Sequence, residues 1–372
     1  MGRPLVFMWD NYGPMHIDRC EAVAMQFAGR RDVIGIELAG TSHTYGWTPS
    51  NGQRFRKVTL FQGASFTQVS GLQRLSALLK ACISQGRADY FFCHYERPEI
   101  FLTAIVLRLL GRRVYVMNDS KFDDRPRSIW REIAKAFALW PYNGAMVSGP
   151  RAKDYMRFLR FALDRTAIGY DTISIERIRT LAAADPAPSG TPFEERHFTV
   201  VARFVPKKNL PTVLDAYAKY AQSVAIPRTL HLCGSGELDL ALREQVSRLK
   251  LQDLVIFRNF IQSEEIAKTL ANTLALLLVS NEEQFGLVVI EAQAMGVPVI
   301  FTPPCGARDE LLRSGVSGFM VEPDNPAGIA LIMKLIASDE ALWRRLAQGA
   351  IETAPLGDVA RFSRAVEQLC QE

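Results

Sequence analysis

The sequence has no apolar stretch long enough to cross a bilayer, which argues against an integral membrane protein. The best candidates, Leu274–Val279 and Val297–Phe301, have the length of buried strands, whereas a membrane helix needs roughly 20 residues. The first ten residues lead into the strand-like run Leu5–Trp9 without a signal-peptide pattern. We therefore expect a cytoplasmic protein, with peripheral attachment to the inner face of the plasma membrane left open.

Paired cysteine spacings and acidic metal-binding motifs are also missing. The six cysteines are scattered along the chain, so neither a disulfide framework nor a zinc site is expected. No Asp-x-Asp motif occurs, and Asp123-Asp124 is an adjacent pair on a polar stretch. Aromatic-basic repeats and nucleic-acid-binding motifs are absent as well. The sequence thus predicts no metal, no resident cofactor and no nucleic-acid partner.

The composition is that of a globular protein with more than one core. The chain has 372 residues, of which 48% are hydrophobic and 22% charged, enough for two domains of ordinary size. The net charge of +5 is unevenly distributed. Residues 1–180 carry 26 Lys and Arg against 16 Asp and Glu, while the remainder carries 18 against 23. A basic first half suggests an anionic partner, for which a membrane surface is a better candidate than nucleic acid.

Apolar runs of strand length alternate with helix-length amphipathic stretches, which is typical of parallel α/β units. The expected strands are Leu5–Trp9, Val33–Glu37, Tyr90–Cys93, Val114–Met117, Ala145–Val147, Phe198–Ala202, Thr229–Cys233, Leu254–Phe257, Leu274–Val279 and Val297–Phe301. Residues 181–196 have linker composition. We expect two Rossmann-like, doubly wound domains, an acceptor-side domain at 1–180 and a nucleotide-sugar-binding domain at 197–355, facing a central cleft. Residues 356–372 are expected to form a helix that packs back toward the first domain.

Two glutamates flank the predicted start of a helix. A buried strand ends near Ser280, a loop carries Glu283, and Glu291 lies about two turns into the helix that follows. Exposed amides at a helix start, at the carboxyl end of a parallel strand, form a site for an anion or a hydroxyl group. By itself the pair also fits a capped helix with solvated glutamates.

The whole segment Ser280–Ile300 resembles the glutamate-x7-glutamate motif of glycosyltransferase family 4, a retaining family with the two-domain GT-B fold. The resemblance implies that Glu283 contacts the transferred sugar and that Glu291 binds the ribose of the nucleotide. It also implies that backbone amides of the loop contact the donor, namely those of Phe285, Gly286 and Leu287.

Two cations follow the first strand of the second half. Arg203 and Lys208 stand five residues apart before a predicted helix, and a guanidinium fork with an ammonium group suits a diphosphate. Alone they also fit a solvated basic turn, but they match the family pattern. The resemblance then implies that both neutralise the departing diphosphate without a metal. Weaker matches to the nucleotide side are Gly234, Gly236 and Phe260.

The first half matches the family less closely. Gly13 is the only glycine of a turn where the family has a pair facing the phosphates. Asp119 stands where many members have a histidine, as a polar contact or as a helix N-cap. His16 and His94 follow predicted strands and are candidates to accept the proton of the acceptor hydroxyl, although a lone histidine is more often structural.

Residues 127–140 predict an amphipathic helix. Trp130, Ile133 and Phe137 fall on one stripe, and three cations fall on another, namely Arg127, Arg131 and Lys135. This pattern fits a helix lying in a membrane interface, and it equally fits a surface helix that buries its apolar face.

The resemblance implies a retaining, metal-independent transferase of the hexosyltransferase type. It would move a sugar from a nucleoside-diphosphate sugar to a carbohydrate acceptor, lipid-linked, in surface polysaccharide or lipopolysaccharide assembly. The alternatives are a sugar-nucleotide epimerase and a catalytically inactive module that binds sugar nucleotides or lipids.

Overall fold

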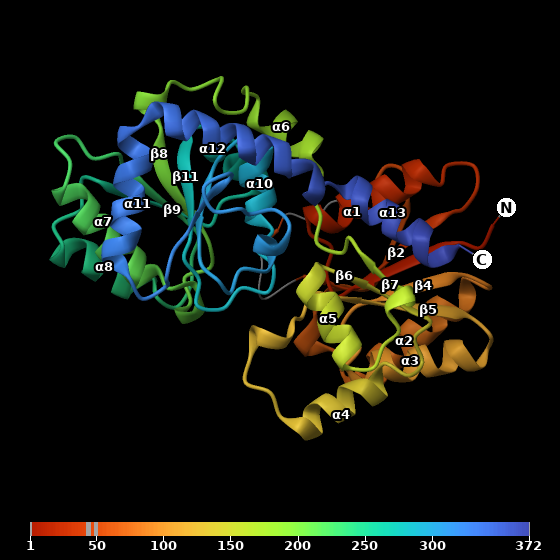
Figure 1. Cartoon of the computed structure of the whole chain (residues 1–372). Helices are drawn as coiled ribbons and strands as arrows, with labels where there is room; N and C mark the ends of the chain where they lie inside the picture. The colour runs from red at the N-terminus through yellow and green to blue at the C-terminus, as the bar shows by residue number, and fades with distance from the viewer. Residues whose placement is uncertain (1, 42–45, 48–50, 372) are drawn as a thin grey trace. The chain divides into compact units, whose positions relative to one another are not determined.

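The computed structural model describes residues 2–41, 46–47 and 51–371, and the chain divides into two compact units (Figure 1). The first unit comprises Met1–Ser174 together with Val359–Glu372, and the second comprises Ile175–Asp358. The chain therefore leaves the first unit once and returns to it once.

The first unit contains a parallel sheet of seven strands, and helices lie between most of these strands in the sequence. The order β3-β2-β1-β4-β5-β6-β7 reverses direction between β1 and β4, which makes a topological switch point. The strands are β1 Leu5–Trp9, β2 Val33–Thr41, β3 Arg56–Ser65, β4 Asp89–Phe92, β5 Arg113–Asn118, β6 Gly144–Val147 and β7 Thr166–Ile168. The helices are α1 Pro14–Gln26, α2 Gly71–Ser84, α3 Pro98–Leu109, α4 Ile129–Ala138, α5 Pro150–Phe158 and α13 Val359–Cys370.

The second unit repeats the architecture with six parallel strands in the order β10-β9-β8-β11-β12-β13. Its switch point lies between β8 and β11. The strands are β8 His197–Val201, β9 Leu230–Cys233, β10 Val255–Asn259, β11 Thr273–Leu278, β12 Val299–Phe301 and β13 Gly318–Met320. The helices are α6 Ile175–Ala182, α7 Leu210–Gln222, α8 Asp239–Arg248, α9 Ser263–Ala271, α10 Val288–Ala294, α11 Pro326–Ser338 and α12 Glu340–Thr353.

The two parallel α/β sheets confirm the fold class predicted from the alternating pattern. Central strands such as β1 and β11 are buried along their whole length, as expected for strands covered by helices on both faces. The sequence analysis did not identify β3, β7 and β13. β3 lies at the edge of its sheet with several exposed residues, and β7 and β13 have three residues each. No helix in the described part of the chain is both long and apolar enough to span a bilayer.

The last helix of the chain, α13, completes the first unit. It packs against α1, and Figure 1 shows these two helices, from opposite ends of the chain, together. Phe362 and Val366 of α13 are fully buried in the same apolar cluster as Phe7 of β1. Gln26 of α1 donates a hydrogen bond of 2.8 Å to Glu367.

Residues 183–196, which make up most of the predicted linker 181–196, pack on the second unit. The structure places the division between the units at 174/175, six residues before the predicted domain end at 180. The amide of Ala187 donates to the carbonyl of Met295 at 2.9 Å, and Ala187 is completely buried. The alanine-rich composition of this segment is typical of a linker. Small side chains also allow two backbones to approach closely, which is their role here.

Arg196 anchors this segment from inside the second unit. Its guanidinium is buried 4.9 Å from the ring centroid of Trp343, and burial lowers the pKa of Arg196 to about 10. It donates to four backbone carbonyls at 2.9–3.2 Å, those of Ser189, Thr191, Ala271 and Thr273.

We expect Arg196→Met to lower the free energy of unfolding of the second unit by about 3 kcal/mol, because it leaves buried carbonyls without a donor. Urea denaturation followed by circular dichroism measures the change. Arg248→Met, on the exposed end of α8, is the matched control and should change stability by less than about 0.5 kcal/mol. Equal stability of the two variants would contradict the anchoring role.

Candidate donor site

Arg203 follows the buried strand β8 and begins a short basic turn. Residues Pro206–Lys208 form one turn of 3-10 helix, after which Asn209 takes a left-handed conformation (φ 56°) and α7 begins. The side chain of Asn209 donates to the carbonyl of Pro323 at 2.9 Å and accepts from Thr212 at 2.8 Å. The turn therefore has a fixed path and presents its cations at the carboxyl edge of the sheet.

The glycine loop after β9 holds this turn from one side. A Cβ atom on Gly234 would lie 1.8 Å from the carbonyl oxygen of Ala202, and one on Gly236 would lie 2.5 Å from that of Phe204. The amide of Phe204 donates to Ser235 at 2.9 Å, and the amide of Gly234 donates to Asn259 at 2.6 Å. In this structure both glycines permit a close approach between two loops.

The loop after β11 holds the same turn from the other side. The amide of Asn281 donates to the carbonyl of Lys207 at 2.8 Å, and that of Glu282 reaches the same oxygen at 3.4 Å. The buried hydroxyl of Thr302, after β12, donates to the carbonyl of Ser280 at 2.6 Å. The loops that follow β8 and β11 are thus joined through their backbones, and the side chain of Thr302 joins the loop after β12 to them.

Glu283 and Lys208 meet where these loops join. The ammonium group of Lys208 forms an ion pair with Oε2 of Glu283, and the hydroxyl of Ser280 donates to the same oxygen at 3.2 Å. The Lys208 and Glu283 side chains are 15% and 11% exposed, so the pair is partly desolvated. The sequence assigns these two residues to diphosphate and sugar, and the structure brings them into direct contact.

The start of α10 depends on a glycine in a left-handed conformation. Gly286 has φ 97°, and a Cβ atom there would lie 3.1 Å from Leu278 and 3.4 Å from the Cys305 sulfur. The Cys305 thiol donates to the carbonyl of Phe285 at 3.2 Å, and the amide of Ala307 donates to the same oxygen at 2.9 Å. Within the described residues, no backbone hydrogen bond uses the amides of Gly286 or Leu287 as donors.

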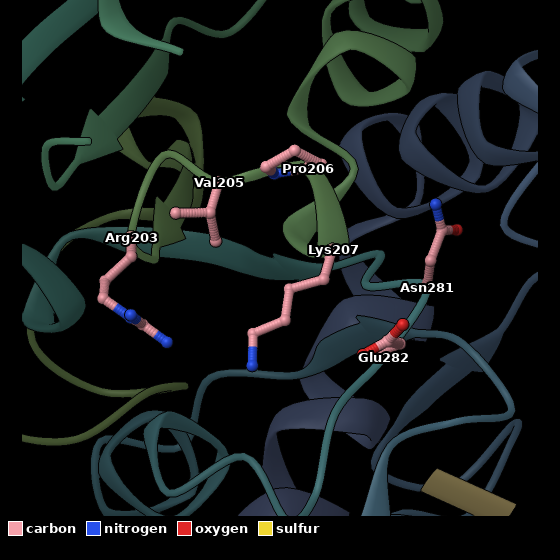
Figure 2. A pocket seen from close by; sticks show the side chains of 6 residues that line it. All are labelled: Arg203, Val205, Pro206, Lys207, Asn281 and Glu282. Atoms are coloured by element: carbon pink, nitrogen blue, oxygen red, sulfur yellow. The ribbon is translucent and has the colours of Figure 1, made fainter. Parts of the chain in front are cut away.

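A cavity of about 590 Å³ opens beside the basic turn. Figure 2 shows the guanidinium of Arg203 and the ammonium group of Lys207 pointing into the same open space. The full lining is Arg203, Val205, Pro206, Lys207, Asn281 and Glu282. Sequence reasoning missed Lys207, and the signal that could have identified it is the adjacent pair Lys207-Lys208 in the same turn.

Two further predicted donor contacts belong to the same unit. Glu291 is half-buried on α10, and its amide donates to Leu287 at 3.4 Å. Phe260 follows β10 and is 42% exposed, a high value for a phenylalanine. No group of three or more histidine, cysteine, aspartate or glutamate side chains placed to hold a metal occurs among the described residues.

The remaining predicted residues lie at the carboxyl edge of the first sheet. His94 follows β4 in a left-handed conformation, with Nε2 3.5 Å from a carboxylate oxygen of Asp10, which follows β1. Arg97 pairs with the same carboxylate at 2.7 Å. The Cys93 sulfur beside the ring, assisted by Glu96 and Asp10, raises the pKa of His94 to about 11. The role of His94 as the base for the acceptor hydroxyl stays a prediction.

His16 and Gly13 are engaged with each other at the start of α1. The amide of Gly13 donates to Nδ1 of His16 at 2.9 Å, and the ring lies 4.7 Å from that of Trp9. Burial, followed by the charge of Arg19, lowers the pKa of His16, so the ring is neutral with its proton on Nε2. A Cβ atom on Gly13 would lie 2.5 Å from the ring of Trp47, which thus occupies the close approach expected for a phosphate.

Asp119 follows β5, the strand next to β4, and burial raises its pKa. Its carbonyl accepts from the hydroxyl of Ser148 at 3.4 Å. The structure contradicts the alternative of a helix N-cap, because the next turn begins three residues later, with Lys121 in the capping position. Asp119 thus joins Asp10 and His94 at the ends of three neighbouring strands.

Sequence comparison finds similarity mainly to the second unit. Residues 183–353 match the family described as glycosyl transferases group 1. A stretch of 153 residues is 31% identical to N-acetyl-alpha-D-glucosaminyl L-malate synthase of Bacillus anthracis, covering 41% of this chain and 39% of that protein. Another of 185 residues is 29% identical to the lipopolysaccharide core biosynthesis glycosyltransferase LpsE of Rhizobium meliloti, covering 50% and 51%. The chain thus spans about half, or less, of the curated relatives that it matches.

Comparison with solved structures covers both units. The Anabaena protein HepE, crystallised in complex with UDP and glucose, aligns with a TM-score of 0.74 over 99% of each chain at 16% identity. This likeness concerns the fold, since the sequences have diverged widely. The sequence match relates residues 183–353 to the group 1 glycosyl transferases, and the likeness in structure shows that the chain has the two-domain GT-B fold.

Proposed function

We propose that this protein transfers a sugar from a nucleoside-diphosphate sugar to a carbohydrate acceptor, with retention of the anomeric configuration. The observation that carries the proposal is the convergence of Arg203, Lys207, Lys208 and Glu283 at one edge of the second sheet, beside a cavity of about 590 Å³. Three cations and a carboxylate suit a ligand that has a diphosphate next to sugar hydroxyls. The UDP bound by the fold relative HepE supports a uridine nucleotide as the first donor to test.

Each part of the donor molecule is assigned to the residues whose chemistry suits it. Arg203 and Lys207 point into the cavity and bind the diphosphate, while Glu283 accepts hydrogen bonds from the sugar hydroxyls. Glu291 binds the ribose, and the exposed ring of Phe260 stacks on the base. The amides of Gly286 and Leu287 add donors toward the sugar and the phosphate.

The Lys208–Glu283 ion pair has two roles in this proposal. Before the donor binds, each side chain neutralises the other in a partly desolvated position, where an unpaired charge would be costly. When the sugar–phosphate bond breaks, negative charge develops on the diphosphate, and the preorganised cations of the turn stabilise it. Because this stabilisation comes from side chains, the proposed reaction requires no divalent metal.

The acceptor is proposed to bind at the carboxyl edge of the first sheet. Asp119 and Asp10 offer carboxylates there, and His94 adds a positive charge. Because Nδ1 of His16 accepts a hydrogen bond from the amide of Gly13, we propose that the acceptor proton leaves through the departing diphosphate. The relative named for lipopolysaccharide core biosynthesis favours an acceptor that belongs to surface polysaccharide or lipopolysaccharide assembly. We propose that this acceptor is a lipid-linked carbohydrate and that the transfer takes place in the cytoplasm.

Transfer can be tested with UDP-, GDP- and ADP-sugars in the presence and absence of a carbohydrate acceptor. We expect release of nucleoside diphosphate that depends on the acceptor, and a product whose anomeric configuration, measured by NMR, equals that of the donor. An epimerised sugar nucleotide formed without acceptor would assign the protein to the epimerases. Binding without turnover over the whole panel would assign it to inactive sugar-nucleotide binders.

Glu291→Gln should weaken nucleotide binding, because the ribose loses a charge-assisted hydrogen bond worth about 1.5–3 kcal/mol. We expect Kd for the nucleotide to rise about 10- to 150-fold in isothermal titration calorimetry. Glu244→Gln, an exposed glutamate on α8, is the matched control and should bind as the wild type does. A Kd that Glu291→Gln leaves unchanged would remove the ribose assignment.

Arg203→Met and Lys208→Met should each lower kcat about 100- to 1000-fold with a smaller change in KM, because their charges act mainly on the breaking bond. Lys219→Met, exposed on α7 of the same unit, is the control for loss of a surface cation. Wild-type activity should persist in EDTA. Activity that EDTA abolishes and magnesium or manganese restores would transfer the role of these cations to a metal.

A further inference from the structure

Helix α4 of the first unit turns its apolar side outward. Five large apolar side chains on and just after this helix are between 45% and 76% exposed: Ile129, Trp130, Ile133, Phe137 and Trp140. A surface helix of a globular protein normally buries such a stripe against the core. The sequence left open whether this stripe is buried, and the structure shows that it is not.

The polar side of α4 faces the protein instead. Glu132 is buried and accepts a hydrogen bond from the hydroxyl of Tyr155, on α5. Arg127 and Lys135 donate to the same hydroxyl at 2.9 and 2.8 Å, and they lie 3.5 and 3.4 Å from Glu132. The guanidinium of Arg127 also lies 4.4 Å from the centroid of the Tyr155 ring. This network fixes α4 with its apolar face toward solvent.

The exposed face extends beyond the helix. Phe122 and Phe158 are 48% and 52% exposed, and their rings contact edge to face with centroids 5.1 Å apart. The rings of Phe122 and Phe158 also lie 6.2 and 6.3 Å from that of Tyr155, to which α4 is bound. We call the exposed side chains of α4, Trp140, Phe122 and Phe158 the α4 face; apolar patches of this kind mark sites of interaction.

The charge around the α4 face is positive. Residues 121–165 contain ten Lys and Arg against five Asp and Glu, a net charge of +5. The exposed cations in this segment are Arg125, Arg131, Arg157, Arg160 and Arg165. A second copy of the chain would bring the same positive charge to the interface, so self-association through this face is opposed by repulsion. An anionic surface is attracted to it.

We infer that the α4 face inserts into the headgroup region of a bilayer that contains anionic lipid. Two tryptophans, near the two ends of the helix, favour this occupant, because their rings combine a large apolar area with an N–H donor and prefer the interface between lipid and water. The exposed arginines add electrostatic attraction that decays over about 8 Å at physiological salt. In the membrane alternative that the sequence left open, Arg127 and Lys135 are membrane contacts, whereas in the structure they bind Tyr155 and hold the helix.

The inference does not rest on the transferase reaction, because vesicle binding is measured without any sugar. The full chain is sedimented with vesicles of phosphatidylcholine alone and of phosphatidylcholine mixed with phosphatidylglycerol. We expect binding to the mixed vesicles that weakens as salt rises, and little binding to the neutral ones. The absence of binding to either vesicle would overturn the inference.

The Trp130→Ser/Phe137→Ser double variant should weaken binding to the mixed vesicles about a hundredfold, because two apolar side chains no longer enter the lipid. The matched control is Leu72→Ser/Leu109→Ser, which changes two similarly exposed side chains of the same unit and should bind as the wild type does. Arg131→Glu/Arg157→Glu should lower binding at least about tenfold and flatten its salt dependence. Unchanged thermal unfolding would show that the variants are folded.

Two outcomes would contradict the assignment of the α4 face to lipid. One is a Trp130→Ser/Phe137→Ser variant that binds vesicles as tightly as the wild type. The other is a wild-type dimer in analytical ultracentrifugation that the same substitutions convert to monomer, which would assign the face to a second copy of the chain.

Discussion

Parallel hydrogen bonding between neighbouring strands is the interaction on which both units depend. All named strands of the two sheets pair in parallel, so the carboxyl ends within a sheet lie at one edge and each return crosses the face of the sheet. Arg203, Lys208 and Glu283 occur in loops after β8 and β11, and Asp10, His94 and Asp119 follow β1, β4 and β5. Residues far apart in sequence therefore converge without any dedicated element.

Backbone contacts contribute to holding the loops of the proposed donor site. Gly234 approaches Ala202, and the amide of Asn281 donates to the carbonyl of Lys207, so the basic turn is held on two sides by its backbone. Gly234 cannot be replaced without moving these loops, because even the methyl group of an alanine would collide with the carbonyl oxygen of Ala202.

The sequence was sufficient for the fold class, because a buried parallel strand is a continuous apolar run, and for the segments that meet at the proposed donor site, because the two glutamates flank the start of a helix after such a run. The sequence was insufficient for features that depend on contacts between residues far apart in the chain. The partly exposed edge strand β3 lacks the pattern of a buried strand, and the pairing of Lys208 with Glu283 depends on how two loops meet. The outward face of α4 follows from a buried glutamate, Glu132, meeting a tyrosine 23 residues away, which helical periodicity does not contain.

The placement of α13 has a consequence for the order in which the protein folds during synthesis. The second unit is one continuous segment, Ile175–Asp358, so it has all of its strands and helices as soon as residue 358 is available. The first unit is translated earlier, but Phe362 and Val366 of its core follow the whole second unit in the chain. Until they arrive, the apolar surfaces of β1 and α1 that α13 covers are exposed on the ribosome. The unit that is made first is thus the last to be completed.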